Sequence, residues 1–212
     1  MSSSTFGPEE FQAATNVSRE TLERLKTYAA LLLVWNQRLN LISASSAGEL
    51  WRRHFLDSAQ LNDLVPAAGR WVDLGSGAGF PALVLAILNR QVAGFRMHLT
   101  ERIARKCDFL REVIRTTEAP AEVHFGRIEA IPPLRADVVT ARACADLPEL
   151  LKYFQRHRAP SGIGIFAKGR NLAEELTRAQ ADWTLAFDVY PSRSGGEGQI
   201  LVIRSAERRS HA

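Results

Sequence analysis

Cysteine is scarce in this sequence of 212 residues, which holds only Cys107 and Cys144. Two thiols can build neither a disulfide framework nor a cysteine-rich metal site, so we expect a reducing compartment. The five histidines, at positions 54, 98, 124, 157 and 211, show no H-x-x-x-H spacing and no cysteine-paired spacing. Zinc sites are usually marked by such spacing, and the sequence therefore predicts no metal.

Long apolar runs are also missing. No stretch reaches the roughly 18 apolar residues of a membrane span, and the N-terminus lacks a basic segment followed by an apolar run. We therefore expect a cytoplasmic protein that does not enter a membrane. With 46% hydrophobic residues, the chain is long enough for one full α/β core, and any second domain would be small.

Acidic residues are in the minority, with 23 Asp and Glu against 27 Lys and Arg and a formal net charge of +4. This modest excess suits a polyanionic partner such as nucleic acid. It does not demand one, because an ordinary solvated basic surface has the same composition. Most of the excess is arginine, which makes bidentate phosphate contacts better than lysine does.

The chain divides into a helical part and an alternating part, with a break at residues 65–69. We expect residues 1–65 to form a helical cap and residues 66–212 to form the main domain, the two making one compact unit. Ser18 is placed to cap a first helix, and a second helix is expected from about Gly48 to Leu64. The apolar face of the first helix is predicted to hold Leu22, Leu25, Tyr28, Ala29, Leu32 and Leu33.

Beyond Arg70, seven short apolar runs predict seven strands. They are Trp71–Leu74, Met97–Thr100, Glu122–Phe125, Asp137–Ala141, Ile163–Ala167, Leu185–Tyr190 and Ile200–Arg204. The helices expected between them are Leu83–Asn89, Ile103–Thr117, a short turn near Ile128, Leu147–Arg158 and Leu172–Trp183.

Alternating strands and helices predict a parallel, doubly wound sheet. The segment 191–198 between the last two strands is too short for a crossover helix, so those strands must pair as a hairpin. The final strand is then antiparallel to the other six. This is the Rossmann-like architecture of class I methyltransferases, and it differs from that of dehydrogenases.

The most informative segment is Asp73–Pro81, which reads as a strand end, a glycine-rich turn and the start of a helix. Gly75, Gly77 and Gly79 let backbone N–H groups approach a ligand beside a helix N-terminus. The spacing is G-x-G-x-G, and with the acidic Asp73 it points to S-adenosyl-L-methionine, whose amino acid end is zwitterionic. A structural glycine turn without a ligand is the alternative.

Further candidates close other strands at the same sheet edge. Glu101 can accept both ribose hydroxyls of a nucleoside, or it can simply serve as an acid at a helix N-terminus. Backbone N–H groups of 126–129 can reach an adenine. Arg142 can clamp a carboxylate or a phosphate, and Lys168 adds a second cation there. A surface ion pair is the alternative for each of these two cations.

Five segments together resemble one family, RsmG, once called glucose-inhibited division protein B. In chain order they are 35–43 (WNQRLNLIS), 53–58 (RHFLDS), 72–81 (VDLGSGAGFP), 105–110 (RKCDFL) and 141–143 (ARA). The resemblance covers roughly residues 22 to 204. It implies a methyltransferase that uses S-adenosyl-L-methionine to methylate N7 of guanine 527 in the 530 loop of 16S ribosomal RNA.

The resemblance also implies partners and site residues. The partner would be 16S ribosomal RNA or the small ribosomal subunit, and we expect the protein to act as a monomer. The cofactor contacts would come from the residues matching Gly75, Phe80, Ile128, Glu129 and Arg142. Three positions depart from the family pattern: Ala82 and Arg102 replace a usual glycine and serine, and Gly198 stands where many relatives have a basic residue. Arg193 is a possible substitute for that last residue.

This chemistry needs no general base, because guanine N7 carries a free lone pair. Positioning the guanine in line with the methyl group of the cofactor is then sufficient for the displacement to occur. For His54 and Asp57 two interpretations stay open: they line the guanine pocket, or they form a bonded pair that fixes the cap to the sheet.

The candidates for RNA contact are Arg52, Arg53, Arg156, Arg158, Lys168, Arg170 and Arg193, each of which could equally be a solvated surface charge. Two other functions also remain open from the sequence. One is a class I methyltransferase that acts on another RNA or on a small molecule. The other is a non-catalytic nucleotide-binding module.

Overall fold

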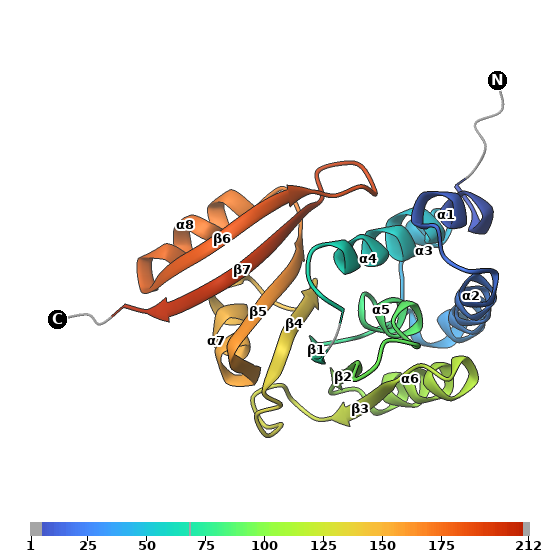
Figure 1. Ribbon diagram of the computed structural model, residues 1–212, viewed down its shortest axis with the longest axis horizontal. Coiled ribbons are helices and arrows are strands. Elements are labelled where there is room, and N and C mark those ends of the chain that lie inside the picture. The colour runs from blue at the N-terminus through green and yellow to red at the C-terminus, as the bar shows by residue number, and fades with distance from the viewer. Residues whose placement is uncertain (1–5, 68, 210–212) are drawn as a thin grey trace.

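The computed structural model describes residues 6–67 and 69–209, so Ala68 and His211 lie outside the described residues. Seven strands form one sheet in the order β3-β2-β1-β4-β5-β7-β6 (Figure 1). They are β1 (Arg70–Leu74), β2 (Arg96–Glu101), β3 (Ala121–Phe125), β4 (Ala136–Arg142), β5 (Arg158–Lys168), β6 (Trp183–Pro191) and β7 (Gln199–Arg208).

The strand pairing confirms the expected fold class. Strands β1 to β5 pair in parallel, whereas β7 is antiparallel to both of its neighbours, β5 and β6. Chain order reverses between β1 and β4, which are adjacent in the sheet. In open α/β sheets the crevice at such a point, outside the carboxyl ends of the strands, is where ligands bind.

Each expected apolar run lies inside an observed strand, and the differences are at the ends. Trp183 was assigned to a helix, but it begins β6, because helix α8 (Leu172–Asp182) stops before it. The Trp183 backbone is extended and its side chain is buried against the core. Similarly, α7 (Leu147–His157) ends one residue early and β5 follows at once, beginning at Arg158.

Alternation along the strands sends side chains to two cores. Trp71 belongs to the core beneath α5 (Ala82–Leu88), α6 (Ala104–Thr117) and the cap, whereas its neighbour Val72 belongs to the core beneath α7 and α8. Figure 1 shows α7 and α8 at the end of the sheet that carries β5 to β7, and α5 and α6 at the opposite end. Residues of the cap and the sheet share the first core.

The cap consists of α1 (Pro8–Thr15), α2 (Arg19–Leu39), α3 (Ala44–Ala47) and a composite helix. Ser18 caps α2 as expected, its Oγ accepting from the Thr21 N–H at 3.1 Å. Leu33 was expected on the apolar face, and this was wrong: it is 46% exposed because it lies at the margin of the buried stripe. The buried Tyr28 of α2 donates to the Ala78 carbonyl at 2.6 Å and so ties the cap to the glycine turn.

The composite helix replaces the single helix expected from Gly48 to Leu64. It runs as a π-helix (Trp51–Leu56), one α-turn α4 (Asp57–Ala59) and a 3₁₀ turn (Gln60–Asp63). A π segment changes the angle between successive side chains, and such segments often occur at functional sites. In residues 6–67 and 69–209, no helix is both long and apolar enough to cross a membrane.

Candidate functional site

The glycine turn between β1 and α5 is bonded to the end of β2. Gly75, Gly77 and Gly79 all have positive φ, at 66°, 54° and 92°. The Gly75 N–H donates to Thr100 Oγ1 at 3.0 Å, and the Gly77 N–H donates to Glu101 Oε2 at 2.9 Å. Two of the backbone groups that we expected to face a ligand are therefore already engaged within the protein.

Gly79 has a packing role in addition to its backbone conformation. A Cβ at this position would lie 2.5 Å from Leu83 Cδ1 and 2.8 Å from Tyr28 Oη. At Gly77, by contrast, a Cβ would meet the Gly75 carbonyl oxygen at 3.8 Å. Gly79 thus allows the turn to pack closely against α5 and the cap, whereas Gly77 leaves open space beside the backbone.

Asp73 closes β1 and is 1% exposed. Its Oδ1 accepts from the Thr140 hydroxyl at 2.7 Å, while its Oδ2 is buried and has no hydrogen-bond partner among the residues that the structure describes. Burial raises the pKa of Asp73 to about 7, well above the ordinary value of 3.8. A buried carboxylate oxygen without a donor is costly in folding free energy.

Glu101 closes β2 and is almost completely buried. Its Oε1 accepts from the N–H groups of Arg102 and Ile103, both at 2.8 Å, and its Oε2 accepts from Gly77. The carboxylate therefore acts as the acid at the start of α6, which was our alternative interpretation. A carboxylate has about four acceptor positions, so one remains for a ligand hydroxyl.

A cavity of about 540 Å³ lies at the carboxyl ends of β1, β2 and β4. The expected cofactor residues among those that line it are Gly75, Gly77, Phe80, Glu101, Ile128, Glu129 and Arg142. Asp73 and Gly79, which we also expected, are buried and are not among the residues that line this cavity. The departures Arg102 and Ala82 differ in place: Arg102 lines the cavity, whereas Ala82 is buried at the start of α5.

Several lining residues were missed by the sequence interpretation. They include Leu41 from the cap, Lys106 of α6, Cys144 and Tyr153 of α7. Leu41 and Lys106 lie within the segments that carry the family resemblance, and this was the available signal. Tyr153 had none, because it reaches the cavity from a helix on the other face of the sheet.

A second cavity of about 730 Å³ adjoins the first, and Arg142, Ala143 and Ala145 line both. Its other walls come from the cap, the end of β5 and the loop between β6 and β7. The cap contributes Arg52, Arg53 and Asp57. Gly198, the departure beside the last strand, also lines this cavity, together with Arg170.

Arg142 is the residue between the two cavities. One of its terminal nitrogens lies 2.8 Å from His54 Nδ1, and the other donates to the Arg53 carbonyl at 3.3 Å. Its guanidinium carbon lies 5.0 Å from the centre of the Phe80 ring, on which His54 stacks at 4.9 Å. The arginine is held by the cap and by an aromatic face, so its orientation is fixed.

His54 and Asp57 do not form the bonded pair that we had considered. His54 contacts Arg142 and Phe80, whereas Asp57 Oδ1 accepts from the hydroxyls of Ser192 and Ser194 at 2.7 and 2.9 Å. Gln60 donates to the same oxygen at 3.0 Å. Both residues approach Arg142, because Asp57 Oδ2 lies 3.8 Å from one of its terminal nitrogens. Asp57 also fixes the cap to the loop between β6 and β7, and it lines the second cavity.

Known relatives identify the chain. Residues 21–199 match the family model described as rRNA small subunit methyltransferase G. A relative from Parvibaculum lavamentivorans, named ribosomal RNA small subunit methyltransferase G, is 53% identical over 92% of this chain and 88% of its own length. One of the same name from Rhodospirillum centenum is 50% identical over 94% and 91%. The chain belongs to the rRNA small subunit methyltransferase G family.

Solved structures agree with this assignment at the level of the fold. The crystal structure of M. jannaschii TYW2 in complex with AdoMet aligns with a TM-score of 0.55 at 13% identity, over 72% of this chain and 75% of that one. The family model and the two relatives confirm the family resemblance drawn from the five sequence segments, and with it the enzyme class.

Burial shifts the pKa values of two side chains at the site in opposite directions. Burial, with the Arg142 charge, lowers the pKa of His54 to about 3, so this imidazole is neutral at pH 7. Burial raises the pKa of Cys144 to about 11, so its thiol is not a ready nucleophile. At neutral pH His54 is therefore held neutral and Cys144 is held as the thiol.

The expected RNA-contacting cations separate into free and engaged groups. Lys168 is 8% exposed, and its Nζ donates to Glu175 at 2.7 Å and to the Ala145 carbonyl at 3.1 Å. Arg193 pairs with Asp63 at 2.7 Å and borders a different hollow, so it does not replace the missing basic residue at 198. Arg156 and Arg158 bond to Ile131 and Gln155, away from both cavities.

Three arginines remain available at the second cavity. Arg53 is half-exposed with only a long contact of 3.8 Å to Glu49, and Arg52 lies over the Phe6 ring. Within the described part of the chain, Arg170 has no ion-pair partner. Among the expected RNA contacts, Arg52, Arg53 and Arg170 are therefore the cations that ion pairs within the described residues neutralise least.

Proposed function

We propose that this protein transfers a methyl group from S-adenosyl-L-methionine to N7 of guanine 527 in the 530 loop of 16S ribosomal RNA. The observation that carries this proposal is the pair of adjoining cavities that meet at Arg142, in a chain of the rRNA small subunit methyltransferase G family. One cavity suits the methyl donor and the other suits the acceptor base.

The residues of the first cavity fit the donor. The open space at Gly77 admits a ligand close to the backbone, and the partnerless Oδ2 of Asp73 offers charge to an ammonium group. The remaining acceptor position of Glu101 suits a ribose hydroxyl. Ile128 and Glu129 line the side where an adenine would lie. When bound, S-adenosyl-L-methionine supplies an electrophilic methyl group.

The residues around the second cavity orient the guanine and do not exchange protons with it. Guanine N7 attacks through its own lone pair, so neutral His54 and protonated Cys144 are compatible with the reaction. The fixed guanidinium of Arg142 can donate to an acceptor edge, and guanine presents O6 beside N7. Holding donor and acceptor in line accounts for the rate enhancement without a general base.

The arginines of the second cavity support RNA as the acceptor. Arg52, Arg53 and Arg170 present charges that Asp or Glu side chains neutralise little, as expected for phosphate contacts. We assign the acceptor side to the cap of residues 1–65 and the donor side to the domain of residues 66–212. We expect the protein to act as a monomer on the small ribosomal subunit.

The deciding experiment uses small ribosomal subunits from a strain that lacks this methyltransferase. Incubation with methyl-labelled S-adenosyl-L-methionine should place label in guanine, and chemical cleavage at N7-methylguanine should map it to nucleotide 527. The variant Arg142→Lys keeps the charge but cannot keep both cap contacts, and its rate should fall about 100-fold. Label at another nucleotide, or only in small molecules, would refute the substrate assignment.

RNA binding is tested separately through its salt dependence. Changing Arg170 to alanine should reduce the slope of log affinity against log salt by about 0.9, the contribution of one phosphate contact. Arg204→Ala is the matched control, because Arg204 is exposed but pairs with Asp188 on the hairpin of β6 and β7. Equal slopes for the two variants would mean that the basic face is incidental.

A further inference from the structure

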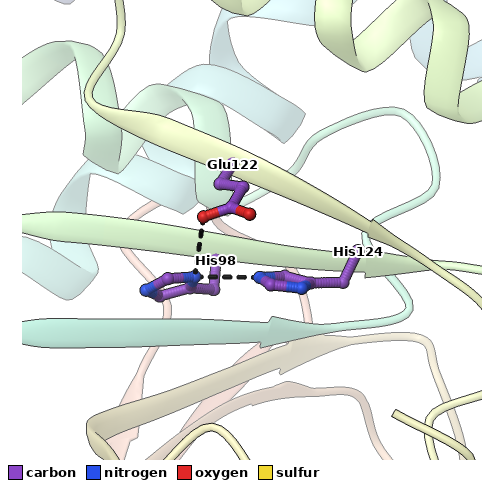
Figure 2. Close-up of side chains that lie close together, drawn as sticks. All are labelled: His98, Glu122 and His124. Carbon is purple, nitrogen blue, oxygen red and sulfur yellow. Dashed lines mark hydrogen bonds and ion pairs between the residues drawn. The ribbon is translucent and has the colours of Figure 1, made fainter. Parts of the chain in front are cut away.

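Two neighbouring strands place two imidazoles and a carboxylate on the same face of the sheet. His98 lies on β2, and Glu122 and His124 lie two residues apart on β3, which is the edge strand. The register pairs His98 with Glu122. It places His124 two residues further along β3, opposite Thr100. Figure 2 shows the His124 ring and the Glu122 carboxylate both directed toward the His98 ring.

The distances fit a shared ligand. His98 Nδ1 lies 2.9 Å from His124 Nε2 and 3.8 Å from Glu122 Oε2, and one ligand atom of each residue lies within 4.8 Å of the other two. Zinc bonds of about 2.0–2.1 Å in tetrahedral geometry separate two donors by about 3.4 Å. The two contacts at His98 lie on either side of that value, so side-chain rotations can bring the three donors to the spacing that an ion requires.

The cluster is accessible and separate from the catalytic crevice. The side chain of Glu122 is 67% exposed and that of His98 is 16% exposed, so an ion can reach the site from solvent with a water molecule as a further ligand. Neither His98, Glu122 nor His124 is among the residues that line the two cavities. An ion held here would not contact the proposed substrates.

The surrounding charge favours some ions over others. Arg70 and Arg96 lie near His98 and add positive potential, which a single carboxylate offsets only in part. Hard cations such as Mg²⁺ and Ca²⁺ prefer several oxygen ligands and gain little from imidazole. Zn²⁺, Co²⁺, Ni²⁺ and Cu²⁺ bind imidazole well.

We propose that His98, Glu122 and His124 form a binding site for one divalent transition-metal ion of the zinc class. The ion replaces the proton that the two imidazoles now share and joins the edge strand β3 to β2. Since β3 leads directly into the loop that carries Ile128 and Glu129, the ion stabilises the sheet edge beside the first cavity.

Titration of the full-length, tag-free protein with Co²⁺ tests the site directly. One equivalent should produce the visible absorption bands of a low-symmetry, four- or five-coordinate ion, and one equivalent of Zn²⁺ should remove them. The thermal unfolding midpoint should rise with Zn²⁺ and not with Mg²⁺, because an ion that binds only the folded state stabilises it.

Variants locate the ion. His124→Ala should abolish the bands, and Glu122→Gln, at a largely exposed position, should weaken binding at least about tenfold. Glu207→Gln on β7 is the control for an exposed carboxylate, and His211→Ala is the control for binding by a terminal histidine. If His124→Ala fails to fold, as judged by circular dichroism, Glu122→Gln decides the matter.

Three results would overturn the proposal. They are the absence of saturable Co²⁺ binding, unchanged binding in Glu122→Gln with folded protein, and loss of binding in His211→Ala alone. All three readouts are independent of methyl transfer, so the proposed enzymatic function can fail or hold without affecting this test.

Discussion

The raised pKa of Asp73 predicts how this one carboxyl group contributes to the pH dependence of stability. Its pKa is about 7 in the folded protein and 3.8 as the ordinary value, a difference of about three units. At 1.36 kcal/mol per unit, burying this group as a carboxylate costs about 4 kcal/mol of folding free energy above pH 7. Because the pKa is higher in the folded state, the folded protein keeps this proton to a higher pH than the unfolded chain does. The contribution of Asp73 to the free energy of unfolding therefore decreases as pH rises from about 4 to about 7.

The substitution Asp73→Asn removes the charge and keeps the shape. Its oxygen can still accept from Thr140, while its amide N–H₂ takes the place of an oxygen that has no partner, at a cost of about 1–3 kcal/mol. At pH 8 the variant should therefore be more stable than the wild type by about 1–3 kcal/mol. Between pH 8 and pH 5 this advantage should shrink by about 2–3 kcal/mol, because the wild-type carboxyl becomes protonated.

Urea unfolding of both proteins from pH 5 to pH 9 measures the difference. Asp108→Asn is the control, since Asp108 is 61% exposed and pairs with Arg111 on the surface of α6. If the difference between wild type and Asp73→Asn stays constant over this pH range, the reasoning is wrong. In the same series, affinity for S-adenosyl-L-methionine should fall below pH 7 in the wild type, and Asp73→Asn should show weak binding at every pH.

Three further predictions concern the turn and the cap. Gly79→Ala should destabilise the protein by about 1–3 kcal/mol in urea unfolding, because its Cβ would clash with Leu83; Gly94→Ala, also at positive φ but with no atom within 4 Å, should cost less. Tyr28→Phe should cost about 1–3 kcal/mol by the same measurement, since the buried Ala78 carbonyl loses its donor; an unchanged midpoint would show that this bond contributes nothing. Asp57→Ala should speed hydrogen exchange in residues 192–198, because the serine hydroxyls lose their shared acceptor; unchanged exchange there would contradict the anchoring role.

The sequence predicted the fold well because periodicity and connection length are local properties. Runs such as Met97–Thr100 lie within their strands, and the short segment 191–198 forced the antiparallel end of the sheet. Glu101 was placed correctly at the crevice, but its three backbone donors depend on how the turn folds back over β2.

Side-chain partners were not predictable in the same way. Lys168 meets Glu175 only because α8 packs beside the end of β5, and Asp57 meets Ser192 across 135 positions of chain. The cluster of His98, Glu122 and His124 leaves no spacing signal for a related reason. His98 and His124 are 26 positions apart and come together through parallel strand pairing, which leaves no short motif in the sequence.

Arg142 lines both cavities, and the cap holds it through the Arg53 carbonyl and His54. An acceptor that binds against the cap in the second cavity therefore restricts the motion of the Arg142 guanidinium, which also borders the first cavity. The two binding steps are then thermodynamically linked, and the linkage must be reciprocal: each molecule changes the affinity for the other by the same factor. Comparing the affinity for each ligand with and without the other, in wild type and Arg142→Lys, measures that factor. A factor of one in the wild type would mean that the shared wall transmits nothing.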